Sequence, residues 1–278
     1  ATCLKMGEIA MPGLLGSAVR QDGRSASLTA PNGQAQQGWS RRNLQAFEER
    51  YRAQFGEDGQ LPLTYDPVLL LARRVEKLEA LNLPNTLCRA VDVTNPDALQ
   101  SAIQEAEEIY GPVDLMVNNA GVMLLGQIDT QDPAEWKKMF DVNVIGLLHG
   151  VQSVLSDMKV RKGGTILNIS SIAGRKSFPN HAAYVGTKFA VSAMSENIRE
   201  EVADDNVRVM TICPGVVGTE LIDHTTDEQI KSDYADWRES IGGALEPDDI
   251  ARTAEFMYGQ PQGMNIREVV VGPTRQPA

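Results

Sequence analysis

The sequence predicts an α/β fold in which helices cover both faces of a doubly wound parallel sheet. Short apolar runs alternate with longer amphipathic stretches along most of the 278 residues. The runs near 113–118, 165–170 and 207–212 are almost continuously apolar, which is typical of strands buried on both faces. Each run ends in small polar residues or glycine, and a chain of this length can form one such domain.

The same pattern gives the order of the elements. Apolar runs predict strands near 68–72, 86–91, 113–118, 165–170, 207–212 and 267–271. Amphipathic periodicity predicts helices near 41–55, 74–81, 96–110, 133–158, 184–203, 226–240 and 246–258.

Bulk composition excludes several classes of partner. A net charge of −11 argues against nucleic acid and against anionic membrane surfaces. No apolar run approaches the roughly 20 residues of a membrane span, and residues 1–16 make a poor signal peptide, so we expect a cytoplasmic protein. Three scattered cysteines and three histidines without ligand spacing predict neither a disulfide framework nor a metal site.

The most informative short motif is Tyr184-Val185-Gly186-Thr187-Lys188. Its phenol and ammonium stand at i and i+4, which share one face of a helix. A nearby ammonium stabilises phenolate, so we expect Lys188 to lower the pKa of Tyr184. A phenol tuned in this way can give a proton to, or take one from, a carbonyl or alcohol oxygen.

The surrounding motifs resemble the short-chain dehydrogenase/reductase family over roughly residues 67–278, which implies a Rossmann-like sheet. They occur in a suitable order and at suitable spacings: Val113 to Gly121 with Asn118-Asn119-Ala120-Gly121 at its end, Asp141-Val142-Asn143-Val144, Thr165 to Ser171, Tyr184 to Lys188, and Cys213-Pro214-Gly215-Val216-Val217-Gly218-Thr219.

The resemblance implies a role for each catalytic position. Tyr184 matches the acid/base, and Lys188 matches the residue that lowers the tyrosine pKa and binds the nicotinamide ribose. Ser171 matches the hydroxyl that bonds the substrate oxygen; Ser170 is the alternative, although its spacing to Tyr184 is one residue longer. Asn143 matches the position that holds a proton-relay water, and the open alternative is a buried structural amide.

The resemblance also implies which residues contact the cofactor. Most lie at the carboxyl ends of expected strands, where open α/β sheets bind ligands. They are Asp92 and Val93 at the adenine, Asn119, Ala120 and Gly121 in the cofactor pocket, and Pro214, Gly215, Val217 and Thr219 near the carboxamide, together with Tyr184 and Lys188.

Two arginines indicate the type of nucleotide. Arg73 and Arg74 follow the expected strand 68–72, at the place where an acidic residue would favour NAD. Guanidinium groups suit a 2′-phosphate by charge and geometry, so we expect NADP, with Arg73 the better aligned. The alternative is a solvated helix start.

The first 66 residues depart from the family. Its first strand, Thr-Gly-x-x-x-Gly-x-Gly turn and helix are missing; Gly13 and Gly16 in the run 11–18 look like loop glycines. We therefore divide the chain into an atypical segment, 1–66, and a dehydrogenase-like domain, 67–278. Either the N-terminal segment supplies the central strand from an unusual sequence, or the sheet has a gap. Residues 47–71 loosely resemble the carboxyl-terminal part of periplasmic amino-acid-binding proteins. Three origins of this likeness stay open: a chimera, a mis-joined reading frame or chance.

The expected function is hydride transfer between NADP(H) and a secondary alcohol or its ketone, a small-molecule substrate. The run 267–275 resembles the branch with 3-hydroxy acid dehydrogenases, which implies a polar or anionic substrate such as a small hydroxy acid.

Residues 219–243 resemble the family's lid, and the resemblance implies a homotetramer built on the helices around 136–158 and 184–201. The competing hypothesis is a cofactor-poor relative that acts as a binding or structural protein.

Overall fold

The computed structural model describes residues 25–26, 67–83 and 85–277. The expected helix over 41–55 and the glycines of the run 11–18 lie outside these residues. None of the helices in the described part is long and apolar enough to cross a bilayer.

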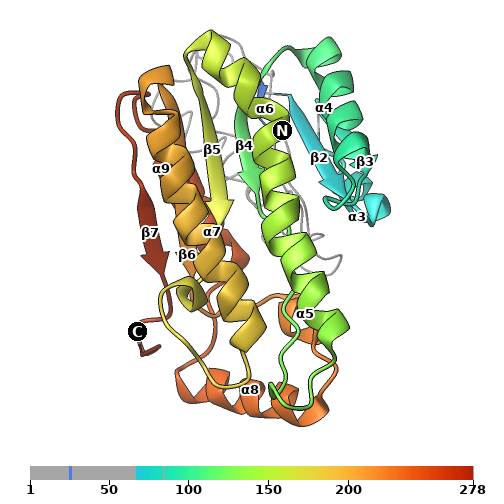
Figure 1. Cartoon of the computed structure of the whole chain (residues 1–278), viewed down its shortest axis with the longest axis vertical. Coiled ribbons are helices and arrows are strands. Elements are labelled where there is room, and N and C mark those ends of the chain that lie inside the picture. The colour runs from blue at the N-terminus through green and yellow to red at the C-terminus, as the bar shows by residue number, and fades with distance from the viewer. Residues whose placement is uncertain (1–24, 27–66, 84, 278) are drawn as a thin grey trace, which may run out of the picture.

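All strand pairs in the described chain are parallel. They form a five-stranded sheet in the order β1-β4-β5-β6-β7 and a two-stranded sheet of β2 and β3 (Figure 1). The strands are β1 (Ser25–Ala26), β2 (Val68–Ala72), β3 (Thr86–Ala90), β4 (Val113–Asn118), β5 (Gly164–Ile169), β6 (Val207–Pro214) and β7 (Glu268–Val271).

The N-terminal segment supplies a short strand between β4 and β2. Ser25 pairs with Val113 and Ala26 with Leu115, so β1 lies beside β4, and it also lies close to β2. The hydrogen-bond ladder is nevertheless interrupted there, because β2 pairs only with β3 among the described strands. Two residues can offer few ladder bonds, so the expected single sheet is divided at this point.

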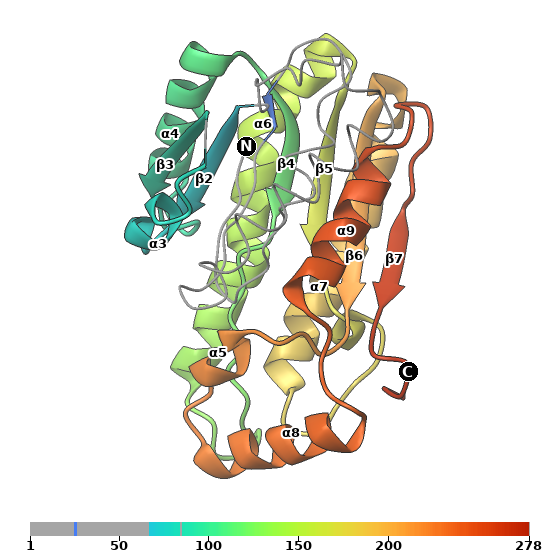
Figure 2. The same cartoon turned by 180° about the vertical axis from the view of Figure 1, so that it is seen from behind.

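The helices cover both faces of the sheets. Helices α4, α6 and α7 pack on one face (Figure 1), and α3 and α9 pack on the other (Figure 2), each over its own apolar cluster. The α-helices are α3 (Val75–Glu79), α4 (Pro96–Tyr110), α5 (Pro133–Phe140), α6 (Gly146–Arg161), α7 (Ala182–Glu201), α8 (Glu228–Ser240) and α9 (Pro247–Tyr258). Shorter turns are the π-helical η1 (Asp141–Ile145) and the 3₁₀ turns η2 (Ile172–Gly174), η3 (Ala203–Asp205) and η4 (Glu220–His224).

Local chemistry explains where three of these helices begin. Helices α4, α5 and α9 each start with proline, whose missing N–H costs nothing in the first turn. Before the proline stands a residue whose side chain accepts a backbone N–H: Asn95, Asp132 and Glu246.

One expected helix differs from the structure. The sequence predicts an uninterrupted helix over 133–158, whereas the structure has α5, then the π-helical η1, then α6 ending at Arg161. Within η1, Asn143 bonds both the N–H and the carbonyl of Val122, at 2.8 and 2.9 Å. A π-helical turn adds a residue to the helix and is often found at functional sites.

Close packing between α6 and β4 requires a glycine. Gly150 faces Asn118, and a Cβ at this position would overlap the Asn118 carboxamide. That carboxamide is buried and donates to Asn168 Oδ1 at 2.9 Å, so it has little freedom to move. Gly150 therefore sets how closely α6 approaches the strand that ends at the candidate site.

We expect Gly150→Ala to lower the free energy of unfolding by about 1–3 kcal/mol, the usual cost of overpacking a core. Urea unfolding measures this difference. Gly163→Ala is the matched control, because a Cβ there has no neighbour within 4 Å. Equal stability of the two variants would show that the α6–β4 contact can relax.

Candidate active site

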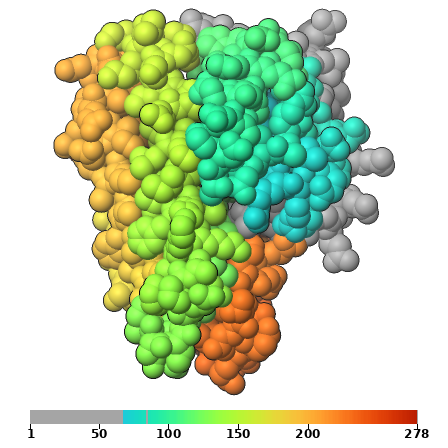
Figure 3. All heavy atoms as spheres, turned by 45° about the vertical axis from the view of Figure 1, so that its right-hand side comes forward, coloured from blue at the N-terminus to red at the C-terminus, as the bar shows by residue number. Residues whose placement is uncertain are grey.

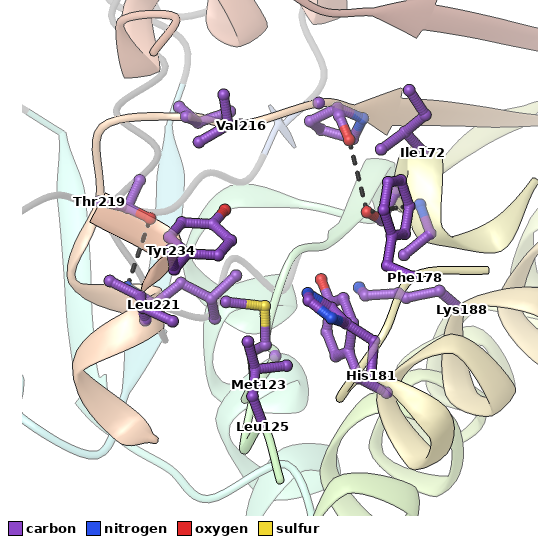
Figure 4. A pocket seen from close by; sticks show the side chains of 18 of the residues that line it. Met123, Leu125, Ile172, Phe178, His181, Lys188, Val216, Thr219, Leu221 and Tyr234 are labelled. Carbon is purple, nitrogen blue, oxygen red and sulfur yellow. Dashed lines mark hydrogen bonds between the residues drawn. The ribbon is translucent and has the colours of Figure 1, made fainter. Parts of the chain in front are cut away.

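A cavity of about 340 Å³ lies at the carboxyl ends of β4, β5 and β6. Segment 219–245, which contains η4 and α8, forms part of its wall and is called the lid segment below. In the space-filling view the lid segment, in orange, lies beside α5, in green, at one end of the molecule (Figure 3). Figure 4 shows Lys188 and His181 on one side of the cavity, with Leu221 and Tyr234 on the other.

Tyr184 and Lys188 lie one turn apart on α7, and each is only 5% exposed. The Lys188 Nζ lies 5.8 Å from the centre of the Tyr184 ring. It donates a hydrogen bond of 2.9 Å to the carbonyl of Ile169, the last residue of β5. An ammonium has three donors, so two remain for a molecule in the cavity.

Burial controls the titration of both groups. Desolvation lowers the pKa of Lys188 to about 8. Desolvation also raises the pKa of Tyr184, and the hydrogen bond with Ser171 only partly opposes this. The pKa of Tyr184 is therefore raised on balance by burial, and the role of Lys188 in lowering it remains a prediction.

The two adjacent serines have different surroundings. Ser171 Oγ accepts from Ala173 N at 3.0 Å and donates to the Pro214 carbonyl at 3.4 Å, and Ser171 lines the cavity together with Tyr184. Ser170 bonds the Lys188 carbonyl at 3.1 Å and the Ser192 hydroxyl at 2.8 Å, so it ties α7 to the end of β5. Ser171 is thus the serine that the structure places beside the phenol.

Asn143 links the loop after β4 to α7 through buried hydrogen bonds. Besides its two bonds to Val122, its Nδ2 donates to Thr187 Oγ1 at 3.1 Å, and the residue is 1% exposed. Its amide is therefore occupied by structural bonds rather than directed into the cavity, which agrees with the alternative of a buried structural amide. The role of a proton relay remains a prediction.

The expected cofactor positions divide into two groups. Asn119, Gly121, Pro214, Gly215, Val217 and Thr219 line the cavity together with Tyr184 and Lys188. A Cβ at Gly121 would lie 3.8 Å from Lys188 Nζ, so glycine keeps the space beside the ammonium open.

The second group lies away from the cavity. Asp92 accepts from the backbone and hydroxyl of Thr94, at 2.9 and 2.8 Å. Val93 is buried, with its carbonyl 2.9 Å from His149 Nδ1, and Ala120 packs against the core. These positions follow β3 and β4, beyond the enclosed part of the site.

Both arginines of the expected phosphate site are exposed at the start of α3. Arg74 is ion-paired with Glu220 of η4 at 3.2 Å, and Lys77 lies 3.6 Å from the same carboxylate. The lid segment therefore reaches the nucleotide end of the expected cofactor site, a contact that the sequence does not reveal.

Several cavity residues were absent from the sequence-based prediction. Some come from the lid segment and from the C-terminus: Leu221, Ile230, Tyr234, Trp237, Arg238 and Gln276. The spacing of Ile230, Tyr234 and Trp237 was a usable signal, because it marks one face of α8. The Gln276 Oε1 accepts from Val216 N at 3.0 Å and so steadies the loop after β6.

The parallel sheet with a buried tyrosine, lysine and serine at its carboxyl edge defines a dehydrogenase-type oxidoreductase. The chain belongs to the short chain dehydrogenase family, whose model matches residues 66–230. Among the described residues, no group of three potential ligands could hold a metal ion.

Relatives and solved structures agree with this family. An uncharacterized oxidoreductase of Staphylococcus saprophyticus is 35% identical over 215 residues, which cover 75% of this chain and 86% of that protein. A closed form of serine dehydrogenase complexed with NADP+ is 28% identical, with a TM-score of 0.70, covering 83% of this chain and 92% of its own. A metagenomic short-chain oxidoreductase in complex with NADP is 29% identical, with a TM-score of 0.61, covering 75% and 86%.

We expect Lys188→Met to stabilise the protein without ligand while removing activity. Lowering the lysine pKa from 10.5 to about 8 corresponds to a cost of about 3 kcal/mol for the buried charge at pH 7. The variant also loses the hydrogen bond to the Ile169 carbonyl, which offsets about 1 kcal/mol of this gain in stability. The net gain is then about 2 kcal/mol, measured by urea unfolding.

The gain should depend on pH in a defined direction. Below pH 8, Lys188 is charged in both the folded and the unfolded chain, so the parent bears the full free-energy cost of burying this charge. It is neutral in both above about pH 10.5, so the advantage of the methionine should shrink as the pH rises between these values. A gain that did not change over this range would show that the ammonium is well solvated.

Proposed function

We propose that this oxidoreductase transfers a hydride between NADP(H) and a secondary alcohol or its ketone. The observation that carries the proposal is the buried Tyr184, with Lys188 one turn away on α7, at a cavity that both line together with Ser171. The two NADP-bound neighbours described above support the choice of cofactor.

The described residues fit the nicotinamide half of this cofactor. Two donors of the Lys188 ammonium suit ribose hydroxyls, and Gly121 leaves room beside them. Asn119, Val217 and Thr219 would enclose the ring from the ends of β4 and β6. When bound, the nicotinamide accepts or donates the hydride at its C4 position.

The chain's own residues handle the proton. In ketone reduction, Tyr184 gives its hydroxyl proton to the carbonyl oxygen as the hydride reaches the carbonyl carbon, and Ser171 bonds the same oxygen. Because burial raises the pKa of Tyr184, the phenol is protonated at neutral pH and ready to act as an acid. The ammonium of Lys188 then stabilises the phenolate that forms.

The same proposal covers the remaining sequence-based expectations. Residues 67–278 form the catalytic domain, residues 1–66 are an atypical segment, and the protein acts in the cytoplasm. It assembles as a homotetramer through the helical run from α5 to α6 and through α7. Phe140, Ile145 and Phe189, which lie on these elements, are large apolar side chains that are 42–44% exposed, and the proposed contact would cover them.

We expect Tyr184→Phe to remove essentially all turnover while leaving NADPH binding intact, because only the proton carrier is lost. Steady-state oxidation of NADPH with a ketone that the parent reduces measures turnover. NADPH fluorescence titration measures binding. Retention of more than about a tenth of kcat would contradict the role of Tyr184, because acid catalysis contributes at least a hundredfold.

A parent chain that binds neither NADPH nor NADH in that titration would reject the oxidoreductase proposal. The competing hypothesis, a cofactor-poor binding or structural protein, would then stand.

The choice of nucleotide makes a separate prediction. Arg73→Asp combined with Arg74→Ala should weaken NADPH binding about tenfold or more, because a charge-assisted contact to the 2′-phosphate is lost. NADH binding should hold or improve. Arg73→Ala alone should weaken NADPH binding more than Arg74→Ala, since Arg73 is the better aligned of the two.

The control for this series is Arg252→Ala, which removes an exposed arginine from α9. Its dissociation constants for NADPH and NADH should match those of the parent. Unchanged constants in the double variant would show that neither arginine meets the nucleotide.

A further inference from the structure

The lid segment presents an aromatic wall to the cavity. Ile230, Tyr234 and Trp237 of α8 face inward and line it. The Tyr234 ring lies 5.4 Å from that of Trp237 and 6.5 Å from that of His181, which in turn lies 5.6 Å from Phe178. These four rings join the lid segment to the loop before α7. Phe178 and His181 lie on the side of Lys188, with the His181 ring 6.3 Å from that of Tyr184, and Tyr234 faces them from the other side (Figure 4).

The same helix also brings a cation to the cavity. Arg238 lines the cavity and is half-buried. No Asp or Glu of the described chain lies within ion-pair distance of it, whereas Arg161, Arg199 and Arg252 each pair with at least one carboxylate. Its charge acts on the neighbouring Tyr234 and opposes the rise in pKa that burial causes there.

The other charged groups of the cavity do not neutralise this arginine. Among the described lining residues the acidic one is Asp233, which is exposed and whose Oδ1 accepts from Gln229 Nε2 at 2.8 Å. Lys188 adds a second cation at the catalytic end. The cavity therefore combines an apolar wall with an excess of positive charge, and a half-buried guanidinium gains most from a bidentate carboxylate partner.

We propose that the substrate is an oxo acid, or the corresponding hydroxy acid, with an apolar body, and that Arg238 binds its carboxylate. This inference rests on the proposed function. The carbonyl group meets Ser171 and Tyr184 at the strand ends, while the carboxylate lies at α8. The aromatic rings of Phe178, His181, Tyr234 and Trp237 pack against its carbon skeleton.

A matched set of substrates tests the proposal. We choose 4-oxo-4-phenylbutanoate, its methyl ester and butyrophenone, which share a phenyl ketone and differ in charge. With NADPH, the parent should reduce the acid with a kcat/KM at least about tenfold above that of the ester. In Arg238→Gln the value for the acid should fall about tenfold to a hundredfold, with the ester within about twofold of the parent.

Two further variants separate the contact from general charge. Lys231→Gln removes a cation from the same helix outside the cavity, and it should leave the ratio of acid to ester unchanged. Arg238→Lys should restore part of the preference. A parent that reduces the ester as well as the acid, or an equal loss in Lys231→Gln, would overturn the role of Arg238 while leaving the oxidoreductase proposal intact.

Binding of an unreactive acid separates failure of this inference from failure of the proposed function. In a thermal-shift assay, 4-phenylbutanoate should raise the Tm of the parent but not that of Arg238→Gln. The uncharged 4-phenylbutanamide should raise the Tm of neither. This result without turnover of any ketone would support the anion site and reject the catalytic proposal. Equal shifts in parent and Arg238→Gln would reject the anion site whatever the turnover.

Discussion

The burial of one ammonium determines how the site is built. Lys188 has nearly no contact with solvent, so its position depends on the acceptor at the end of β5, the carbonyl of Ile169. That bond fixes the height of α7 above the sheet, and Ser170 holds the Lys188 carbonyl from the same strand end. Once α7 is set, Tyr184 necessarily lies one turn away and beside Ser171. The arrangement of the candidate site thus follows from where a buried cation finds its acceptor.

A chain of buried hydrogen bonds keeps the strands and helices in register beneath this site. Asn118 of β4 donates to Asn168 of β5, which donates to Ser195 of α7, at 2.9 and 2.8 Å. Asn143 makes a second link, from η1 to the loop after β4 and to Thr187 of α7. Each polar group is satisfied by a partner from another element, so a shift of one element would leave several buried groups unpaired. The site is therefore preorganised by groups that do not face the cavity.

Local signals predicted most of the fold, and long-range contacts account for the differences. The spans 68–72, 96–110 and 113–118 agree with the structure residue for residue, because apolar pattern and proline capping are local. The π-helical turn depends on Asn143 reaching Val122, which precedes it by 21 residues, and no local pattern reports such a bond. Strand β1, next to β4, has only two residues and lies in a segment without apolar periodicity, so its sequence carried no strand signal.

The candidate site divides in the same way. Motif spacing predicted residues that the structure gathers around the cavity, such as Tyr184, Lys188 and Gly121, because they follow strands or share a helix face. It did not predict Tyr234 or Trp237, since apolar residues at helical spacing are equally typical of a core helix. Nor could it show that Glu220 reaches Arg74, a contact between residues separated by 146 positions.

The lid segment connects the two ends of the site. Its base is fixed where Val216 and Gly218 bond Leu245, at 3.0 and 2.8 Å. Its middle is held by the buried Thr225, whose hydroxyl accepts from Leu125 N at 3.1 Å. Between these points it carries Glu220 toward α3.

Farther along the same segment, α8 carries Arg238 into the cavity. The residues that we propose to select the nucleotide and the substrate thus contact one element. A displacement of that element would alter both contacts together, because its two ends are held by the same short base.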